Sequence, residues 1–146
     1  MATRSAIGFV EYDGSVTGIY CHWDGYLEGV GKKLVEHYSD TSKLLDLIDL
    51  GDISCLGPEL GEKHPFSYHD VEMNSERYDE LYGNMTTAYG RDRGELNCEA
   101  HDFACINHFR MHFKHCEYFY LYDGNEWTYS KSNAKGFRPV PVLMEA

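Results

Sequence analysis

Alternation of apolar and polar residues near both ends of the chain predicts two β-hairpins. In the first, Ser5–Tyr12 and Val16–Trp23 are rich in β-branched and aromatic residues, and Asp13-Gly14 between them is typical of a tight turn. In the second, residues 117–122 and 126–129 flank an Asp-Gly-Asn turn. We therefore expect one antiparallel hairpin near each end of the chain.

Between the hairpins, apolar residues recur at helical spacing. One amphipathic stretch begins at Leu27 and is expected to end near His37. Asp40 or Thr41 is a plausible N-cap for a second short helix, and Gly51 lies just past its end. Residues 52–75 read as a long connection. Two further helices are expected over residues 76–82 and 102–112.

These elements predict an α+β fold in a single domain spanning residues 1–146. The economical arrangement joins the two hairpins in one antiparallel sheet and packs the helices on one face of it. After Ser130 the chain contains several bases and two prolines, so residues 131–146 are expected to form an extended tail.

Length and composition narrow the class of protein. The chain has 146 residues, and its longest apolar stretch is far shorter than the roughly 20 residues that cross a bilayer. No secretory signal is visible at the start, and five cysteines is an odd number for a disulfide framework. We therefore expect reduced thiols, a cytoplasmic location and no membrane partner.

Charge argues against direct binding of nucleic acid. The formal net charge is −11, and residues 40–99 hold 14 acidic against five basic residues. A reader of nucleic acid normally presents a basic face. An acidic inhibitor of a DNA-binding enzyme is one hypothesis that fits this charge, and solubility alone is the simpler explanation.

Metal-capable side chains are densest between residues 98 and 116. If this segment were helical throughout, spacings of 3, 4, 3, 4 and 3 would place six of them in one stripe: Cys98, His101, Cys105, His108, His112 and His115. The pair His108 and His112, with Cys105 or His101, is the predicted metal site, and zinc is the expected ion. The alternative is structural, with buried cysteines and solvated histidines.

The segment GIYCHWDGY, residues 18–26, is the first candidate ligand site. It gathers polar and aromatic side chains at a strand end, where binding sites often form: Tyr20, His22, Trp23, Asp24 and Tyr26. Cys21 and His22 point to opposite faces of a strand and cannot act together as a catalytic dyad. Ligand binding is therefore favoured over catalysis, and core packing of Cys21 and Trp23 is the structural alternative.

The segment AYGRDRGE, residues 88–95, is the second candidate. Arg91 and Arg93, beside Tyr89, could hold a phosphate or a carboxylate. An ordinary exposed turn with self-neutralising charges explains the pattern equally well. The chain contains no P-loop, GxGxxG or GxSxG motif, so the common nucleotide-binding and hydrolase classes lack support.

Twelve tyrosines are the remaining oddity of composition. Tyr118, Tyr120 and Tyr122 share one face of the second hairpin. Such a face suits a protein interface, because tyrosine offers a large contact area and a hydroxyl group. It suits a buried core equally well. Homo-oligomer formation therefore stays open.

Several segments together resemble a family of small, largely uncharacterised proteins from bacteriophages and bacteria. The resemblance rests on a TRSxIG-like start, GIYCHWDGY, an LGDIS-like segment, AYGRDRGE and a closing EYxYLYDGxxW hairpin. Here these are Thr3–Gly8, Gly18–Tyr26, Leu50–Ser54, Ala88–Glu95 and Glu117–Trp127. The resemblance implies a phage or mobile-element setting, where compact acidic proteins bind host defence or takeover targets.

Three hypotheses of function follow. The leading one is a non-enzymatic phage-type protein without a cofactor, which blocks host defence by binding a host protein or a small nucleotide signal. The second is a metal-dependent enzyme or metal-stabilised domain that uses the Cys/His cluster. The third is the acidic inhibitor of a DNA-binding enzyme. No catalytic residue is predicted.

Overall fold

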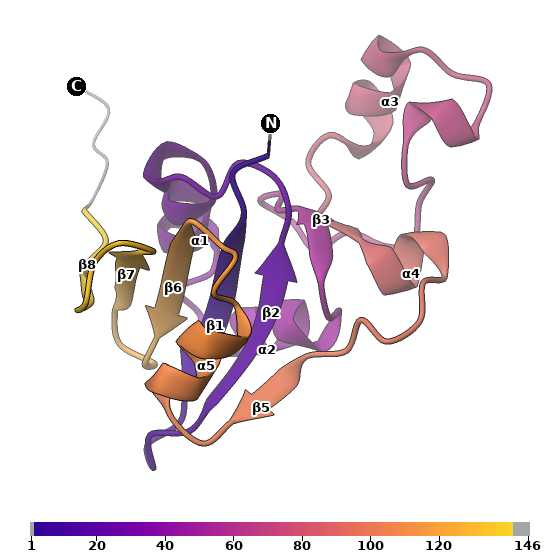
Figure 1. Ribbon diagram of the computed structural model, residues 1–146. Helices are drawn as coiled ribbons and strands as arrows, with labels where there is room; N and C mark the ends of the chain where they lie inside the picture. The colour runs from indigo at the N-terminus through magenta and orange to yellow at the C-terminus, as the bar shows by residue number, and fades with distance from the viewer. Residues whose placement is uncertain (1, 142–146) are drawn as a thin grey trace.

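The computed structural model describes residues 2–141, which form one mixed β-sheet with helices packed against it (Figure 1). Strands follow the order β4-β3-β2-β1-β6-β7-β8, and β5 pairs with the same edge of β2 as β3 does. The strands are β1 (Ser5–Val10), β2 (Val16–Cys21), β3 (Ile53–Cys55), β4 (Thr87–Ala88), β5 (His101–Phe103), β6 (Tyr118–Tyr122), β7 (Trp127–Lys131) and β8 (Arg138–Pro139). The helical segments are the π-helix η1 (Leu27–Gly31), α1 (Lys32–His37), α2 (Thr41–Asp49), the 3-10 helix η2 (Tyr68–Asp70), α3 (Ser75–Tyr82), α4 (Tyr89–Arg93) and α5 (Ile106–His112).

Both predicted hairpins are present, and the α+β class is confirmed. β1 pairs with β2 and β6 pairs with β7, each antiparallel. Gly14 and Gly124 occupy the turns with φ of 91° and 93°, a region that suits glycine because it has no Cβ. In the first turn the Asp13 carboxylate accepts a hydrogen bond from Ser15 N at 3.0 Å.

The sheet is not purely antiparallel, which corrects the expectation. The two hairpins join through β1 and β6, which run parallel from Ser5↔Tyr118 to Phe9↔Tyr122. β2 and β3 are parallel as well. Parallel pairing needs a long connection between the strands. Residues 11–117 connect β1 to β6, and residues 22–52 connect β2 to β3.

The first face of the sheet packs against α1 and α2. The tyrosine face of β6 belongs to this core, where Tyr120 is fully buried and donates its hydroxyl to Gly25 O at 2.6 Å. Leu34 of α1 and Leu44 and Leu47 of α2 are also fully buried there. Asp40 caps α2 by accepting a hydrogen bond from Lys43 N at 3.1 Å, as its position in the sequence predicts.

The second face of the sheet packs against α5, so helices cover both faces and not one. Phe109 of α5 is fully buried among residues of β1, β2 and β6 in a separate apolar cluster. Gly18 permits this packing, because a Cβ at that position would lie 2.6 Å from the Phe109 ring. The expected helix over residues 102–112 is shorter than predicted, since residues 101–103 pair with β2 as β5.

Residues 60–83, which we call the arm, extend from the sheet between β3 and β4 (Figure 1). The helix α3 lies in this arm and contains no buried residue. Of the expected tail, the part up to residue 141 is held to the sheet, because β8 pairs with β7 and Val140 N donates to Trp127 O at 3.0 Å. Residues 142–146 lie outside the described part of the chain. None of the helices in residues 2–141 is long and apolar enough to cross a membrane.

Candidate functional site

Four aromatic rings follow one another on the second face of the sheet, at the C-terminal end of β2. The Tyr20 hydroxyl lies 2.7 Å from His22 Nδ1, and the His22 and Trp23 ring centroids are 4.8 Å apart in an edge-on contact. On the other side Tyr20 packs against His115 at 5.5 Å between centroids. Strand alternation places Tyr20 and His22 on the same face. We call Trp23, His22, Tyr20 and His115 the ring row.

A hollow of about 280 Å³ opens beside the ring row, and we call it the β2 hollow. Its lining residues are Ala2, Arg4, His22, Trp23 and Glu117. Trp23 is 43% exposed, which is unusual for so large an apolar side chain. Arg4 and Glu117 face each other across β1 and β6, with Arg4 N donating to Glu117 Oε1 at 2.8 Å. The hollow thus combines an exposed aromatic ring with one charge of each sign.

The contact between the Tyr20 hydroxyl and His22 Nδ1 bears on which ring nitrogen carries the proton when His22 is neutral. Burial raises the pKa of the Tyr20 hydroxyl, so the phenol stays neutral at physiological pH and can donate its proton to His22 Nδ1. A neutral His22 that accepts at Nδ1 carries its proton on Nε2. The site therefore offers a ring N–H donor beside the exposed Trp23.

Cys21 does not contribute a nucleophile to this site. Its side chain is fully buried on the opposite face of β2, and burial raises the pKa of the thiol to about 12. The Sγ atom lies 3.6 Å from Trp23 O, to which the thiol donates. Because the thiolate is the reactive form, Cys21 is inert near neutral pH.

Asp24 and Tyr26 lie outside the set of residues that lines the β2 hollow. The Tyr26 hydroxyl donates to Asp24 Oδ1 at 3.3 Å, and the charge of Asp24 raises the pKa of Tyr26. Asp24 has a φ of 59°, and its carbonyl accepts a hydrogen bond from Val30 N at 2.8 Å. These two residues shape the chain reversal that begins η1, and both side chains are exposed.

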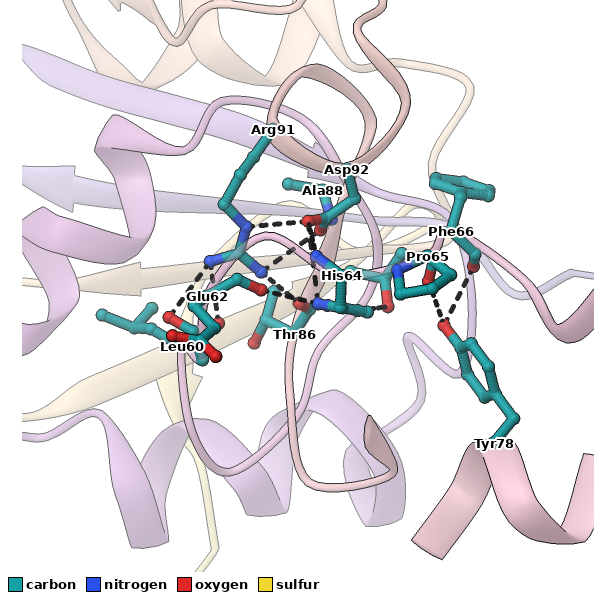
Figure 2. A network of polar contacts seen from close by, with 12 residues as sticks. Leu60, Glu62, His64, Pro65, Phe66, Tyr78, Thr86, Ala88, Arg91 and Asp92 are labelled. Atoms are coloured by element: carbon teal, nitrogen blue, oxygen red, sulfur yellow. Dashed lines mark hydrogen bonds and ion pairs between the residues drawn. The ribbon is translucent and has the colours of Figure 1, made fainter. Parts of the chain in front are cut away.

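Arg91 belongs to a largely buried polar network (Figure 2). Its guanidinium donates twice to the Asp92 carboxylate, at 3.0 and 3.2 Å, and also to Leu60 O at 3.0 Å and Thr86 O at 2.7 Å. These bonds occupy Nε and both terminal nitrogens. Arg91 therefore holds the base of the arm against β4, and its predicted contact with a ligand stays a prediction.

His64 completes this network from the opposite side (Figure 2). Its backbone N–H donates to Asp92 Oδ1 at 3.1 Å, while Ala88 N donates to Oδ2 at 2.8 Å. The imidazole lies 2.7 Å from Glu62 O through Nδ1 and 3.1 Å from Thr87 Oγ1 through Nε2. A neutral ring with its proton on Nδ1 satisfies both contacts. The network is fully bonded and serves folding.

Arg93 lies on the surface, away from Arg91. Its guanidinium packs 4.4 Å from the Phe66 ring centroid and 5.0 Å from that of Tyr89, and it also pairs with Glu95. The hydrogen bond to Glu95 raises the pKa of Arg93. Burial raises the pKa of the half-buried Tyr89 hydroxyl. The two arginines of AYGRDRGE therefore do not converge on one ligand.

The predicted metal residues come together only in part. His101 of β5 and His112 of α5 touch, with ring centroids 4.5 Å apart. His108 lies one turn earlier on α5, and Cys105 precedes the helix as its N-cap residue. Within residues 2–141, no three His, Cys, Asp or Glu side chains form a group that could hold a metal ion. Burial and then the neighbouring His101 lower the pKa of His112.

The β2 hollow contains two residues that no local sequence pattern indicates. Arg4 and Glu117 are 113 positions apart, and the parallel pairing of β1 with β6 brings them together. The structural role of Asp92 is also not evident from the sequence, because a carboxylate between two arginines is typical of an exposed charged turn. Its burial depends on contacts with the arm, which local spacing does not encode.

Comparisons of this chain with protein-family models, with curated proteins and with solved structures gave no match. At the ring row and the β2 hollow, exposed aromatic, hydrogen-bonding and charged groups of the chain lie together.

Proposed function

We propose that this chain is a phage-type binding protein that blocks a host defence or takeover target without catalysing a reaction. The phage setting comes from the family resemblance of its sequence segments. We assign the contact surface to the β2 hollow and the exposed ring of Trp23. The partner we favour is a host protein, and a small nucleotide signal is the alternative ligand.

The exposed Trp23 beside the β2 hollow carries this proposal. Tryptophan and arginine are the residues that most often dominate the free energy of protein association. Trp23 lies next to His22, and Arg4 and Glu117 supply a polar rim. A volume of about 280 Å³ is at the lower limit of ligand pockets, so it suits one or two inserted side chains of a protein.

The state of the reactive groups supports binding over catalysis. Cys21 is buried with a raised pKa, and the carboxylate of Asp92 is enclosed by hydrogen bonds. A nucleophile or general base has to reach its substrate, and neither of these side chains does. His22 can donate a hydrogen bond, which serves recognition as well as chemistry.

Affinity capture from a host lysate tests the proposal. Tagged wild-type protein is compared with Trp23→Ala and Arg4→Ala, and with Tyr12→Ala as the matched aromatic control. Tyr12 is fully exposed in the turn at the other end of the first hairpin. We expect a host protein that wild type and Tyr12→Ala retain and that both hollow variants lose. Turnover of a substrate with no stable partner would contradict the proposal.

A metal-dependent function is the second candidate, and the contact between His101 and His112 favours it. Zinc bound by two imidazoles needs further ligands, which His108 or a partner molecule would have to supply. Elemental analysis of protein purified without added metal tests this candidate. Less than about 0.2 equivalents of zinc, iron, nickel or copper would remove it, because a structural zinc site survives purification.

A further inference from the structure

A cavity of about 510 Å³ lies between β7, β8 and the loop that joins them. It is larger than the β2 hollow and falls within the usual range of ligand pockets, about 300–1,000 Å³. The lining residues that matter here are Tyr129, Ser130, Lys131, Lys135, Phe137 and Arg138. Figure 1 shows β7 and β8 at the yellow end of the chain, at the opposite edge of the sheet from β3 and β4.

The charged side chains that line this cavity are all cationic. Lys131, Lys135 and Arg138 gather there although the whole chain has a net charge of −11. Within residues 2–141 none of the three forms an ion pair with a carboxylate. No acidic side chain of the described residues lines the cavity to neutralise these three cations, and cations without such a partner attract an anion. The cavity therefore favours an anionic ligand.

The wall of the cavity is held in place by Arg110 of α5. Its guanidinium donates to Ser130 Oγ at 2.6 Å and to Ala134 O at 2.7 Å. It also packs 4.6 Å from the Phe119 ring centroid and 5.6 Å from that of Phe137. The loop is thus fixed to the sheet and to α5 before any ligand binds, which lowers the entropic cost of binding.

Aromatic residues line the same cavity as the cations. Tyr129 packs against the core on the first face of the sheet, and Phe137 packs against the cluster on the second face. Phe137 offers a ring on which a nucleobase can stack, and lysine and arginine are the usual partners of phosphate. The overall negative charge opposes a long polyanion such as DNA, while a small anion feels mainly the local cations. We propose that this cavity binds a small phosphorylated ligand of the nucleotide type.

Isothermal titration calorimetry at low salt tests this site with four probes: ATP, AMP, adenosine and inorganic phosphate. We expect ATP and AMP to bind, and adenosine or phosphate alone to bind at least about tenfold more weakly, because each lacks one half of the contacts. The double variant Lys135→Gln/Arg138→Gln should weaken ATP binding by about tenfold or more. Phe137→Leu should weaken AMP and adenosine but leave phosphate unchanged.

Lys63→Gln is the matched control, because Lys63 is an exposed lysine in the arm. It should leave ATP binding unchanged. Three results would overturn the proposal: nucleotide affinities weaker than about 1 mM, equal binding of ATP by the double variant, or phosphate binding as tightly as AMP. The site is separate from the β2 hollow, so Trp23→Ala should bind ATP like wild type even if it loses a host partner.

Discussion

The Asp92 carboxylate connects segments that lie far apart in the sequence. It accepts hydrogen bonds from the backbone of His64 and Ala88 and from the guanidinium of Arg91. The Asp92 side chain is fully buried, and the Arg91 side chain that it pairs with is only 18% exposed. A charge enclosed in this way fixes the base of the arm, and losing it leaves Arg91 uncompensated.

Asp92→Asn should therefore destabilise the fold by about 3 kcal/mol, the range seen when one partner of a buried ion pair is removed. Urea denaturation followed by circular dichroism measures this change. Asp79→Asn is the control, because Asp79 is exposed on α3, and it should change the free energy of unfolding by less than about 0.5 kcal/mol. Equal stability of the two variants would show that the network contributes nothing.

Removal of the Asp52 charge should stabilise the fold, in contrast to Asp92→Asn, and this effect should depend on pH. Burial raises its pKa above 3.8, even though Tyr20 N donates to Oδ1 at 2.9 Å. The folded state therefore favours the protonated carboxyl, and ionisation costs stability as pH rises through the raised pKa. Asp52→Asn keeps an acceptor for Tyr20 N and removes the charge.

We expect Asp52→Asn to melt at a higher temperature than wild type near pH 7. The difference should shrink as pH falls to about 3, where the wild-type carboxyl is protonated too. Thermal melts at both values measure this. Lower stability of the variant at neutral pH would mean that the hydrogen bond from Tyr20 N to the ionised carboxylate outweighs the cost of burial.

The five cysteines should differ in reactivity according to burial. Burial raises the pKa of Cys21 and of Cys116 to about 12 each. The other three, Cys55, Cys98 and Cys105, are partly exposed. Burial and nearby acidic residues also raise the pKa of Cys98. Brief treatment of the native protein with iodoacetamide at about pH 8 should label Cys55 and Cys105 first and Cys98 more slowly, and it should spare Cys21 and Cys116. Peptide mass spectrometry reads the result, and labelling of all five in urea serves as the control.

At the scale of elements, sequence patterns predicted the helices and strands whose formation depends on neighbouring residues in the chain. The hairpins follow from strand alternation and from Gly14 and Gly124 in their turns, and α2 follows from the Asp40 cap. The helix expected over residues 102–112 was wrong at its start. Phe103 packs against the rings of Phe109 and Phe113. This packing, together with the pairing to β2, stabilises residues 101–103 as the strand β5.

Within the arm, α3 is held to residues 64–66 by a small number of side chains. Tyr78 of α3 donates its hydroxyl to Pro65 O at 2.7 Å, and Tyr82 stacks on His64 at 5.3 Å between ring centroids. Because α3 buries none of its residues, little apolar contact supports these bonds. Such segments open locally at low free-energy cost.

Tyr78→Phe should therefore increase amide hydrogen exchange across residues 66–82 and leave exchange in β1 and β2 unchanged. The lost hydrogen bond corresponds to about 1 kcal/mol, confined to the arm. Tyr68→Phe is the matched control, since Tyr68 is an exposed tyrosine of the same arm. Faster exchange throughout the sheet would show instead that the arm supports the whole domain.

At the scale of the whole molecule, each proposed site arises from the pairing of particular strands. The parallel pairing of β1 with β6 brings Arg4 to Glu117 at the β2 hollow. The pairing of β7 with β8 forms the cationic cavity near the C-terminal end. Neither follows from local periodicity, because sequence spacing does not specify which strands become neighbours. Only the GIYCHWDGY half of the hollow was predictable.

The most direct test of the proposed function is the affinity of the captured host protein for variants of the β2 hollow, measured with purified components. We predict that Trp23→Ala raises the dissociation constant by about 30-fold or more, since interface tryptophans commonly contribute 2 kcal/mol or more. Tyr12→Ala should bind like wild type. Equal affinity of Trp23→Ala and wild type, with the variant folded by circular dichroism, would contradict the assignment of the binding surface to the β2 hollow.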